Sequence, residues 1–233
     1  MEKENNKDQT QDSFFLENEA NAWFKRNAEA INKKLSSTDP IVRSLDMFNI
    51  SFESVIDIGA SNGYRLNLLK EKFNPKICVA VEPSEDAIAD GQKRYPFINF
   101  RKGLASNIPT KRSESFDLTI VNFVLHWVDR KTLFTSVAEI DRCVSDNGYL
   151  VIGDFDPGVP IKVKYHHLQD KDAWTYKQDY PKLFTSSNLY QEVARLKISH
   201  KQTGFEIPPN INDQGAITIL KKSLNTNYVE VKI

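Results

Sequence analysis

A strand followed by a glycine-containing turn carries the clearest chemical signal in the sequence. Residues 55–63 read Val-Ile-Asp-Ile-Gly-Ala-Ser-Asn-Gly, so that an apolar run leads into a turn bounded by Gly59 and Gly63. Glycine at such a turn lets a ligand approach the backbone closely, because no side chain is in the way. The segment therefore predicts a ligand-binding loop at the carboxyl end of a strand.

Two phosphate-binding patterns do not fit this loop. A mononucleotide phosphate loop needs Lys and then Ser or Thr after its last glycine, whereas Gly63 is followed by Tyr64 and Arg65. The dinucleotide pattern Gly-x-Gly-x-x-Gly needs three glycines, and here they fall only at Gly59 and Gly63. Neither a phosphate loop nor a dinucleotide loop is expected.

A serine nucleophile is an alternative for the same segment. Residues 59–63 match the Gly-x-Ser-x-Gly pattern of hydrolases, with Ser61 as the nucleophile. Asp154 with His166 or His167 follows in the order that a catalytic triad requires. However, no earlier strand with a glycine-rich oxyanion turn comes before the strand that leads to Ser61, which argues against a hydrolase.

The remaining pattern, an acid two residues before the first glycine, resembles the first motif of the class I S-adenosylmethionine-dependent methyltransferases. Asp57 is this acid, and Ser61 stands where many members have another glycine. The second apolar run ends in Glu82, as the family's second strand ends in an acid that holds both ribose hydroxyls; a carboxylate can accept two such hydrogen bonds. Segments 116–128 and 148–153 resemble later motifs in the correct order, so the resemblance covers residues 54–155.

The resemblance implies an enzyme that binds S-adenosylmethionine, releases S-adenosylhomocysteine and methylates a small molecule at oxygen, such as a sugar or a secondary-metabolite intermediate. A non-catalytic module that binds either compound and acts through a partner is the alternative. The cofactor contacts expected from the resemblance are Trp23, Arg26, Asp57, Gly59, Ala60, Ser61, Gly63, Glu82, Pro83, Ala105, Ser106, Asn107 and Asn122.

One segment departs from the family. In residues 103–109, Gly-Leu-Ala-Ser-Asn-Ile-Pro, Ser106 and Asn107 occupy positions where an acid often meets the adenine amino group. Asparagine keeps an acceptor oxygen, so Asn107 is the expected adenine contact.

Histidines and aromatic residues supply candidates for the acceptor side. A hydroxyl acceptor must lose a proton, and a neutral imidazole is suited to take it near pH 7. We expect His166 or His167 to act as this base, with His126 as the competitor. Adjacent histidines are poorly placed to chelate one metal ion, so no metal site is expected. The expected substrate contacts are Trp127, Tyr165, Tyr176 and Lys177.

Alternating apolar runs and helical patterns must position these residues. Five runs lie at 55–58, 77–81, 98–100, 116–123 and 149–155, with helical patterns at 65–73, 85–95 and 130–144 between them. Such alternation predicts a doubly wound, mostly parallel α/β sheet, and the resemblance implies seven strands. The last two are expected at 216–221 and 228–231, after a helix at 188–196.

The expected organisation is a single domain with additions at both ends. Residues 1–13 form a disordered polar tail, residues 14–50 form N-terminal cap helices, and residues 51–160 form the cofactor-binding core. Residues 161–233 add a substrate-side insertion after the fifth strand, followed by the terminal strands.

Composition and charge restrict the partners. The 233 residues carry 31 basic and 31 acidic side chains, so no global field favours nucleic acid or an anionic membrane. Two isolated cysteines and the absence of an apolar leader predict a cytoplasmic protein. We expect a monomer or a homodimer. From Ile161 onward, eleven basic residues face seven acidic ones, a net +4, which favours an anionic small-molecule acceptor.

Overall fold

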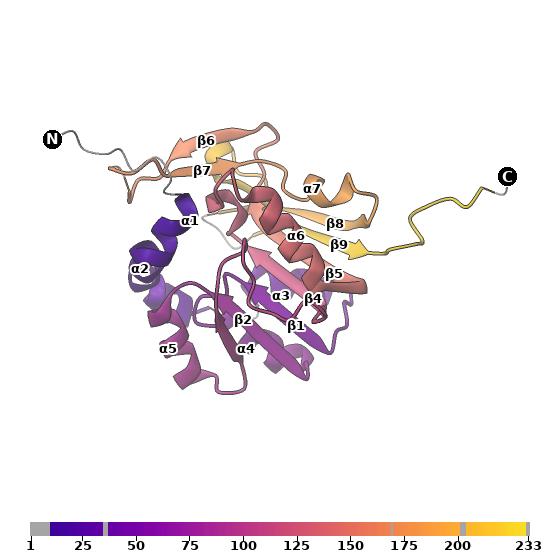
Figure 1. Cartoon of the computed structure of the whole chain (residues 1–233), viewed down its shortest axis with the longest axis horizontal. Coiled ribbons are helices and arrows are strands. Elements are labelled where there is room, and N and C mark those ends of the chain that lie inside the picture. The colour runs from indigo at the N-terminus through magenta and orange to yellow at the C-terminus, as the bar shows by residue number, and fades with distance from the viewer. Residues whose placement is uncertain (1–9, 35–36, 169, 201–203, 232–233) are drawn as a thin grey trace.

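A seven-stranded sheet forms the centre of the computed structural model, which describes residues 10–34, 37–168, 170–200 and 204–231 (Figure 1). The strands are β1 (Ser54–Ile58), β2 (Ile77–Glu82), β3 (Asn99–Lys102), β4 (Phe116–Asn122), β5 (Val144–Phe155), β8 (Tyr190–Ser199) and β9 (Gln214–Lys222). Their order is β3-β2-β1-β4-β5-β9-β8. The predicted fold class is confirmed, because β1 to β5 pair in parallel and only β9 runs antiparallel to its neighbours.

The topology places the ligand crevice beside the glycine loop. Strand β1 pairs with β2 on one side and with β4 on the other, so the strand order reverses at β1. In a doubly wound sheet, ligands bind at the carboxyl ends of the strands at this reversal. The helices that connect the parallel strands are α4 (Tyr64–Phe73), α5 (Glu85–Arg94) and α6 (Leu133–Cys143).

The core consists of two apolar layers, one on each face of the sheet. Neighbouring residues of a strand point to opposite faces, so Val55 packs in one layer and Ile56 in the other. The layer of Ile56 includes residues of α6 and of α7 (Lys182–Thr185), and the layer of Val55 includes residues of α3 (Pro40–Met47) and α4. This burial fixes the strand ends that present the site.

The end of the chain differs from the sequence prediction. Strand β9 confirms the expected strand at 216–221, but the predicted helix at 188–196 is strand β8, and residues 228–231 form no strand. A register shift between Glu192 and Ala194 interrupts the strand pairing. Because the bulge removes the period-two pattern of a regular strand, the sequence of β8 resembled a helix.

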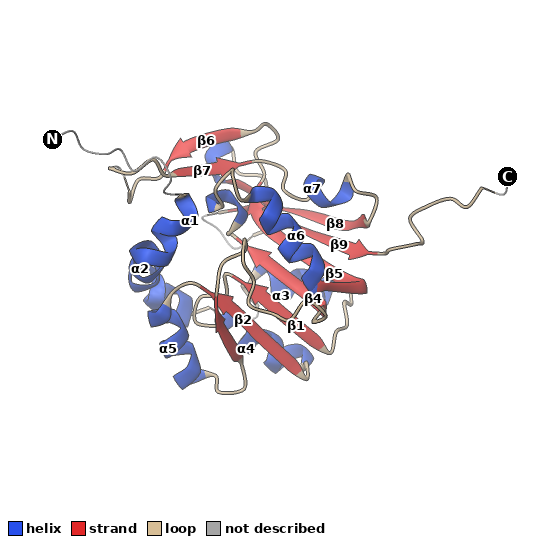
Figure 2. Ribbon diagram, in the orientation of Figure 1, coloured by secondary structure: helices blue, strands red, loops and turns tan. Residues whose placement is uncertain are grey.

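The N-terminal segment and a two-stranded hairpin lie over the carboxyl ends of the sheet (Figure 2). The segment contains α1 (Gln11–Phe14), a π-helical turn at Phe15–Glu19 and α2 (Ala20–Asn32); the hairpin contains β6 (Ile161–Lys164) and β7 (Trp174–Lys177). The prediction of disorder is wrong for residues 11–13. Gln11 and Asp12 are buried, and both form hydrogen bonds with Asp129, which lies in a distant loop. Residues 1–9 lie outside the described part.

The described residues contain neither a membrane-spanning helix nor a metal-binding cluster of side chains. No helix among them is long and apolar enough to span a membrane. Within the same ranges, no group of three or more His, Cys, Asp or Glu side chains is arranged to hold a metal ion.

Candidate functional site

A cavity of about 700 Å³ opens at the carboxyl ends of the parallel strands. Its walls come from the loops that follow β1, β2, β3 and β4, from the N-terminal helices and from the β6–β7 hairpin. This volume lies in the range of small-molecule and cofactor sites.

The glycine loop adopts the conformation that its sequence requires. Gly59 and Gly63 have φ angles of 76° and 77°, and Ser61 between them has 53°. A Cβ atom on Gly59 would lie 2.3 Å from Cγ2 of Val124, so a side chain is excluded there for steric as well as conformational reasons. Gly59 and Ser61 both line the cavity.

Glu82 ends β2 as a buried carboxylate on the cavity wall. Its Oε2 accepts from the backbone N–H of Ser61 at 2.8 Å, and its Oε1 accepts from that of Ser84 at 2.9 Å. Burial raises the pKa of Glu82 to about 7, although the two N–H donors oppose this shift. These two hydrogen bonds fix the carboxylate beside the glycine loop, and each of its oxygens keeps a lone pair that can accept a hydrogen bond from a ligand.

Asp57 lies beneath the loop and does not line the cavity. Its Oδ2 accepts from Nη1 of Arg65 at 3.1 Å, and the Nε of Arg65 lies 3.4 Å from Oδ2 of Asp39. Burial raises the pKa of Asp57 to about 6, with Arg65 opposing the shift. Asp57 thus anchors α4, while Arg65 itself lies on the cavity wall.

Two buried acceptors on the wall have no hydrogen-bond partner within the described part of the chain. They are Oγ of Ser61 and Oδ1 of Asn122. Because an unpaired buried polar atom is costly, these atoms indicate a polar ligand at this position.

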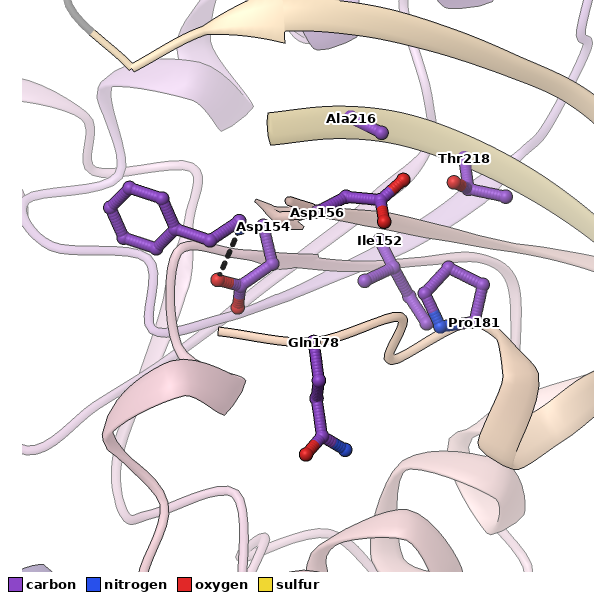
Figure 3. Close-up of a pocket in the computed structure, with 8 residues that line it drawn as sticks. Ile152, Asp154, Asp156, Gln178, Pro181, Ala216 and Thr218 are labelled. Atoms are coloured by element: carbon purple, nitrogen blue, oxygen red, sulfur yellow. Dashed lines mark hydrogen bonds between the residues drawn. The ribbon is translucent and has the colours of Figure 1, made fainter. Parts of the chain in front are cut away.

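A buried histidine–aspartate pair lies at the ends of β4 and β5, and its histidine, His126, lines the cavity. Nδ1 of His126 lies 2.8 Å from Oδ1 of Asp154, and the backbone N–H of His126 points to Oδ2 at 3.3 Å. An ionised carboxylate only accepts hydrogen bonds, so Nδ1 carries a proton; in the neutral imidazole, Nε2 is then the nitrogen with the free lone pair. Asp154 is fixed in turn by the N–H of Phe155 at 2.8 Å (Figure 3).

Behind Asp154 lies a second, much smaller pocket. Figure 3 shows its lining residues, among them Asp156, Gln178 and Thr218. Its volume of about 10 Å³ has room for one water molecule at most. The larger cavity is therefore the candidate site.

Basic groups gather around Phe155 at the acceptor side. Nζ of Lys177 lies 4.0 Å from the centroid of the Phe155 ring and donates to the carbonyl of Asn212 at 2.6 Å. The rings of His126 and His200 each lie 5.0 Å from the same ring. Lys177, His126 and His200 all line the cavity.

Trp127 connects the sheet to the elements that cover the site. Its ring lies 5.1 Å from that of Phe15, 6.4 Å from that of Trp23 and 5.3 Å from that of Tyr165. The hydroxyl of Tyr165 donates to Oε1 of buried Glu19 at 2.6 Å. The cover is therefore a packed layer joined to the hairpin.

His166 and His167 lie at the rim of the cavity. Both are exposed, and their rings are 3.9 Å apart. Desolvation, Arg26 and His166 together lower the pKa of His167. Neither imidazole has a carboxylate partner comparable to Asp154 among the described contacts.

The structure brings most predicted site residues into one cavity. It is lined by Trp23, Gly59, Ser61, Glu82, Pro83, Ala105, Ser106, Asn122, His126, Trp127, Tyr165, His166, His167 and Lys177. The predicted residues that do not line it are Arg26, Asp57, Ala60, Gly63, Asn107 and Tyr176.

Three of these absences have clear causes. Asn107 is exposed on a turn in which its N–H donates to the carbonyl of Leu104. Tyr176 packs instead on the guanidinium of Arg130, 4.2 Å from its ring centroid. Arg26 is held by Glu19 and reaches the cavity only through Tyr165.

Sequence reasoning missed several lining residues, notably Asp12, Lys34, Arg65 and Phe155. It considered Asp154 only as part of a hydrolase triad. The position of Asp154 at the end of an apolar strand, next to the crevice, was a usable signal. No sequence pattern pointed to Asp12.

The geometry does not support a serine hydrolase. Ser61 Oγ has no hydrogen-bond partner in the described ranges, whereas a nucleophilic serine needs a base within reach. Asp154 pairs with His126 and not with His166 or His167. The predicted hydrolase triad of Ser61, Asp154 and His166 or His167 is therefore wrong.

Comparisons with known sequences find methyltransferases. The family model described as a methyltransferase domain matches residues 56–152. The trans-aconitate 2-methyltransferases of Acidovorax sp. (strain JS42) and Acidovorax ebreus (strain TPSY) are each 29% identical over 123 residues. The match covers 52% of this chain but only 45% of each relative, so it spans less than half of their length.

Solved structures share the fold. The 1,6-didemethyltoxoflavin-N1-methyltransferase of Burkholderia thailandensis, solved with S-adenosylhomocysteine, gives a TM-score of 0.67 at 15% identity and covers 92% of this chain and 91% of its own. The N-methyltransferase NodS of Bradyrhizobium japonicum WM9, also with S-adenosylhomocysteine, gives 0.54 at 15% identity over 80% and 90%. At this identity the likeness concerns the fold.

Proposed function

We propose that the chain contains a class I methyltransferase domain and that it transfers the methyl group of S-adenosylmethionine to an oxygen of a small anionic molecule. The observation that carries the proposal is that His126, paired with buried Asp154 behind it, lines one cavity with the glycine loop and Glu82. A base and a cofactor loop that face the same space are what methyl transfer to a hydroxyl requires.

The residues present fit the methyl donor. Glu82 can accept both ribose hydroxyls, and Gly59 allows the ligand close to the backbone. Lys34 and Arg65 line the cavity next to the loop and provide cations for the donor's carboxylate. The unpaired acceptors of Ser61 and Asn122 suit its hydroxyl and amino groups.

When bound, S-adenosylmethionine supplies a methyl group on a positively charged sulfur that departs as a neutral thioether. The chain contributes the proton acceptor. Nε2 of His126 takes the proton of the acceptor hydroxyl, and the oxygen freed of this proton forms the new bond to the methyl carbon. Asp154 holds the imidazole in the required tautomer and stabilises the imidazolium that forms.

Charge supports an anionic acceptor. Lys177 lies 4.0 Å from the Phe155 ring that also contacts His126, so a cation stands next to the proposed base. Lys164 lines the same cavity. The matched relatives are named for trans-aconitate, a small carboxylate, which supports the anionic character of the acceptor but not its hydroxyl group. We propose a diffusible acceptor rather than nucleic acid, because no basic run follows the strand ends.

Transfer of labelled methyl groups tests the proposal. The full-length protein is incubated with methyl-labelled S-adenosylmethionine and panels of hydroxy acids, sugar phosphates, simple carboxylates and amines. Label in ethers of the hydroxyl-bearing anions is expected, and it should require His126. Label confined to methyl esters or amines would contradict the proposed base. Tight cofactor binding without any transfer would instead support the non-catalytic module.

A further inference from the structure

The N-terminal segment places a carboxylate, that of Asp12, against the loop after β3. Residues 103–109 contain no carboxylate, but Oγ of Ser106 donates to Oδ2 of Asp12 at 2.8 Å. Asp12 lines the same cavity as Ala105 and Ser106 and is 9% exposed. We propose that Asp12 binds the exocyclic amine of the cofactor's adenine and so selects adenine over other bases, an inference that rests on the proposed function.

A nucleoside bound at Glu82 would bring its base to the loop that Asp12 contacts. The N–H of Gly103 donates to the carbonyl of Glu82 at 3.2 Å, so the loop after β3 begins beside the proposed ribose site. A nucleoside whose hydroxyls bind Glu82 therefore carries its base against this loop. There, Leu104, Ala105 and Val128 line the cavity and provide apolar surface for a flat ring.

Three hydrogen-bond donors fix the carboxylate of Asp12, and one of its acceptor positions remains available. Oδ1 accepts from the N–H of Asp129 at 2.9 Å, and Oδ2 accepts from Ser106 and from Oγ1 of Thr132 at 2.7 Å. A carboxylate has about four acceptor positions, so one remains on Oδ1. An amine can fill that position, whereas the carbonyl oxygen of hypoxanthine would face a negative charge.

The test compares two ligands that differ at this one group. Calorimetry measures the Kd of S-adenosylhomocysteine and of S-inosylhomocysteine, in which a carbonyl replaces the amine. The wild-type protein is expected to prefer the adenine compound by about 10- to 100-fold, the range for a hydrogen bond to a charged group. Asp12→Asn should reduce this preference to a few-fold, because a neutral amide oxygen binds the amine less strongly than a carboxylate does and repels the carbonyl oxygen less.

Thr132→Val is the matched control. It removes one donor to Asp12, but Thr132 does not line the cavity, so the base preference should persist. A preference retained in Asp12→Asn, or lost equally in Thr132→Val, would overturn the role of Asp12, as would a wild-type protein without any preference. If the wild-type protein binds neither compound, the proposed function fails and this inference fails with it.

Discussion

Nδ1 of His126 lies 2.8 Å from Oδ1 of Asp154, and both side chains are almost completely buried at the ends of adjacent strands. The chain turns at Phe123, which has a φ of 54°, and then forms the short helix Leu125–Trp127 that carries the imidazole back toward β5. The ladder between β4 and β5 therefore sets the orientation of a histidine on the cavity wall.

Asp154→Asn should lower kcat while leaving the affinity for S-adenosylhomocysteine unchanged. The amide can stabilise neither the required tautomer nor the imidazolium, so the rate should fall by about 10²-fold or more, and His126→Ala should cost about 10²- to 10⁴-fold. Steady-state kinetics with the acceptor found by labelled transfer, together with calorimetry, separates the two effects.

Asp156→Asn is the control for this prediction. Asp156 is also a buried acid next to β5, but it pairs with Arg195 and Lys197 and not with His126. The Asp156→Asn variant should keep the wild-type kcat. Equal kcat in the wild-type protein and Asp154→Asn would exclude the pair from catalysis.

The affinity for S-adenosylhomocysteine should depend on pH through Glu82. Its pKa is raised to about 7 mainly by burial, and the ionised form accepts both ribose hydroxyls. Lowering the pH from 8 to 6 protonates the carboxylate, so binding should weaken by about tenfold. Glu82→Gln should bind weakly at both pH values, while Glu85→Gln, which alters an exposed acid paired with Lys102, should keep the wild-type profile. A flat wild-type profile would show that Glu82 does not bind the cofactor in its ionised form.

Gly59→Ala should abolish tight cofactor binding. A Cβ atom there would lie 2.3 Å from Val124 Cγ2, and its φ of 76° already disfavours any side chain by about 1–2 kcal/mol. We expect at least a tenfold rise in the Kd of S-adenosylhomocysteine. Gly158→Ala is the matched control, because Gly158 has a φ of 79° but nothing within 4 Å of an added Cβ. It should lower stability slightly without changing the Kd.

Tyr165→Phe should destabilise the cover. The Tyr165 hydroxyl donates to buried Glu19 at 2.6 Å, so its loss leaves this carboxylate with one fewer donor. The free energy of unfolding in urea should fall by about 1–3 kcal/mol. Tyr228→Phe, at a 55% exposed tyrosine, should have little effect. Equal stability of Tyr165→Phe and the wild-type protein would mean that the hydrogen bond contributes nothing.

The parallel half of the fold was predictable because its signals are local. Each buried strand is a nearly continuous apolar run, and Gly59 and Gly63 mark a turn that only glycine adopts easily. Strand β8 was not predictable in this way, because the bulge between Glu192 and Ala194 interrupts the alternation of side chains between the two faces of the sheet.

The cavity wall around the glycine loop was largely predictable, and the wall around His126 and Asp12 was not. Glu82 and Ser61 lie on contiguous motifs, whereas Asp12 meets Ser106 and Thr132 across 94 and 120 residues. The choice between His126 and the pair at 166–167 depended on which imidazole meets Asp154, and this contact exists only in the folded chain.

Calorimetric titration of the full-length protein with S-adenosylhomocysteine tests the central claim most directly, because the proposed base, Glu82 and Asp12 all depend on a cofactor in the cavity of about 700 Å³. We expect one binding site per chain that Gly59→Ala removes and Gly158→Ala preserves. No binding at millimolar ligand would contradict the account.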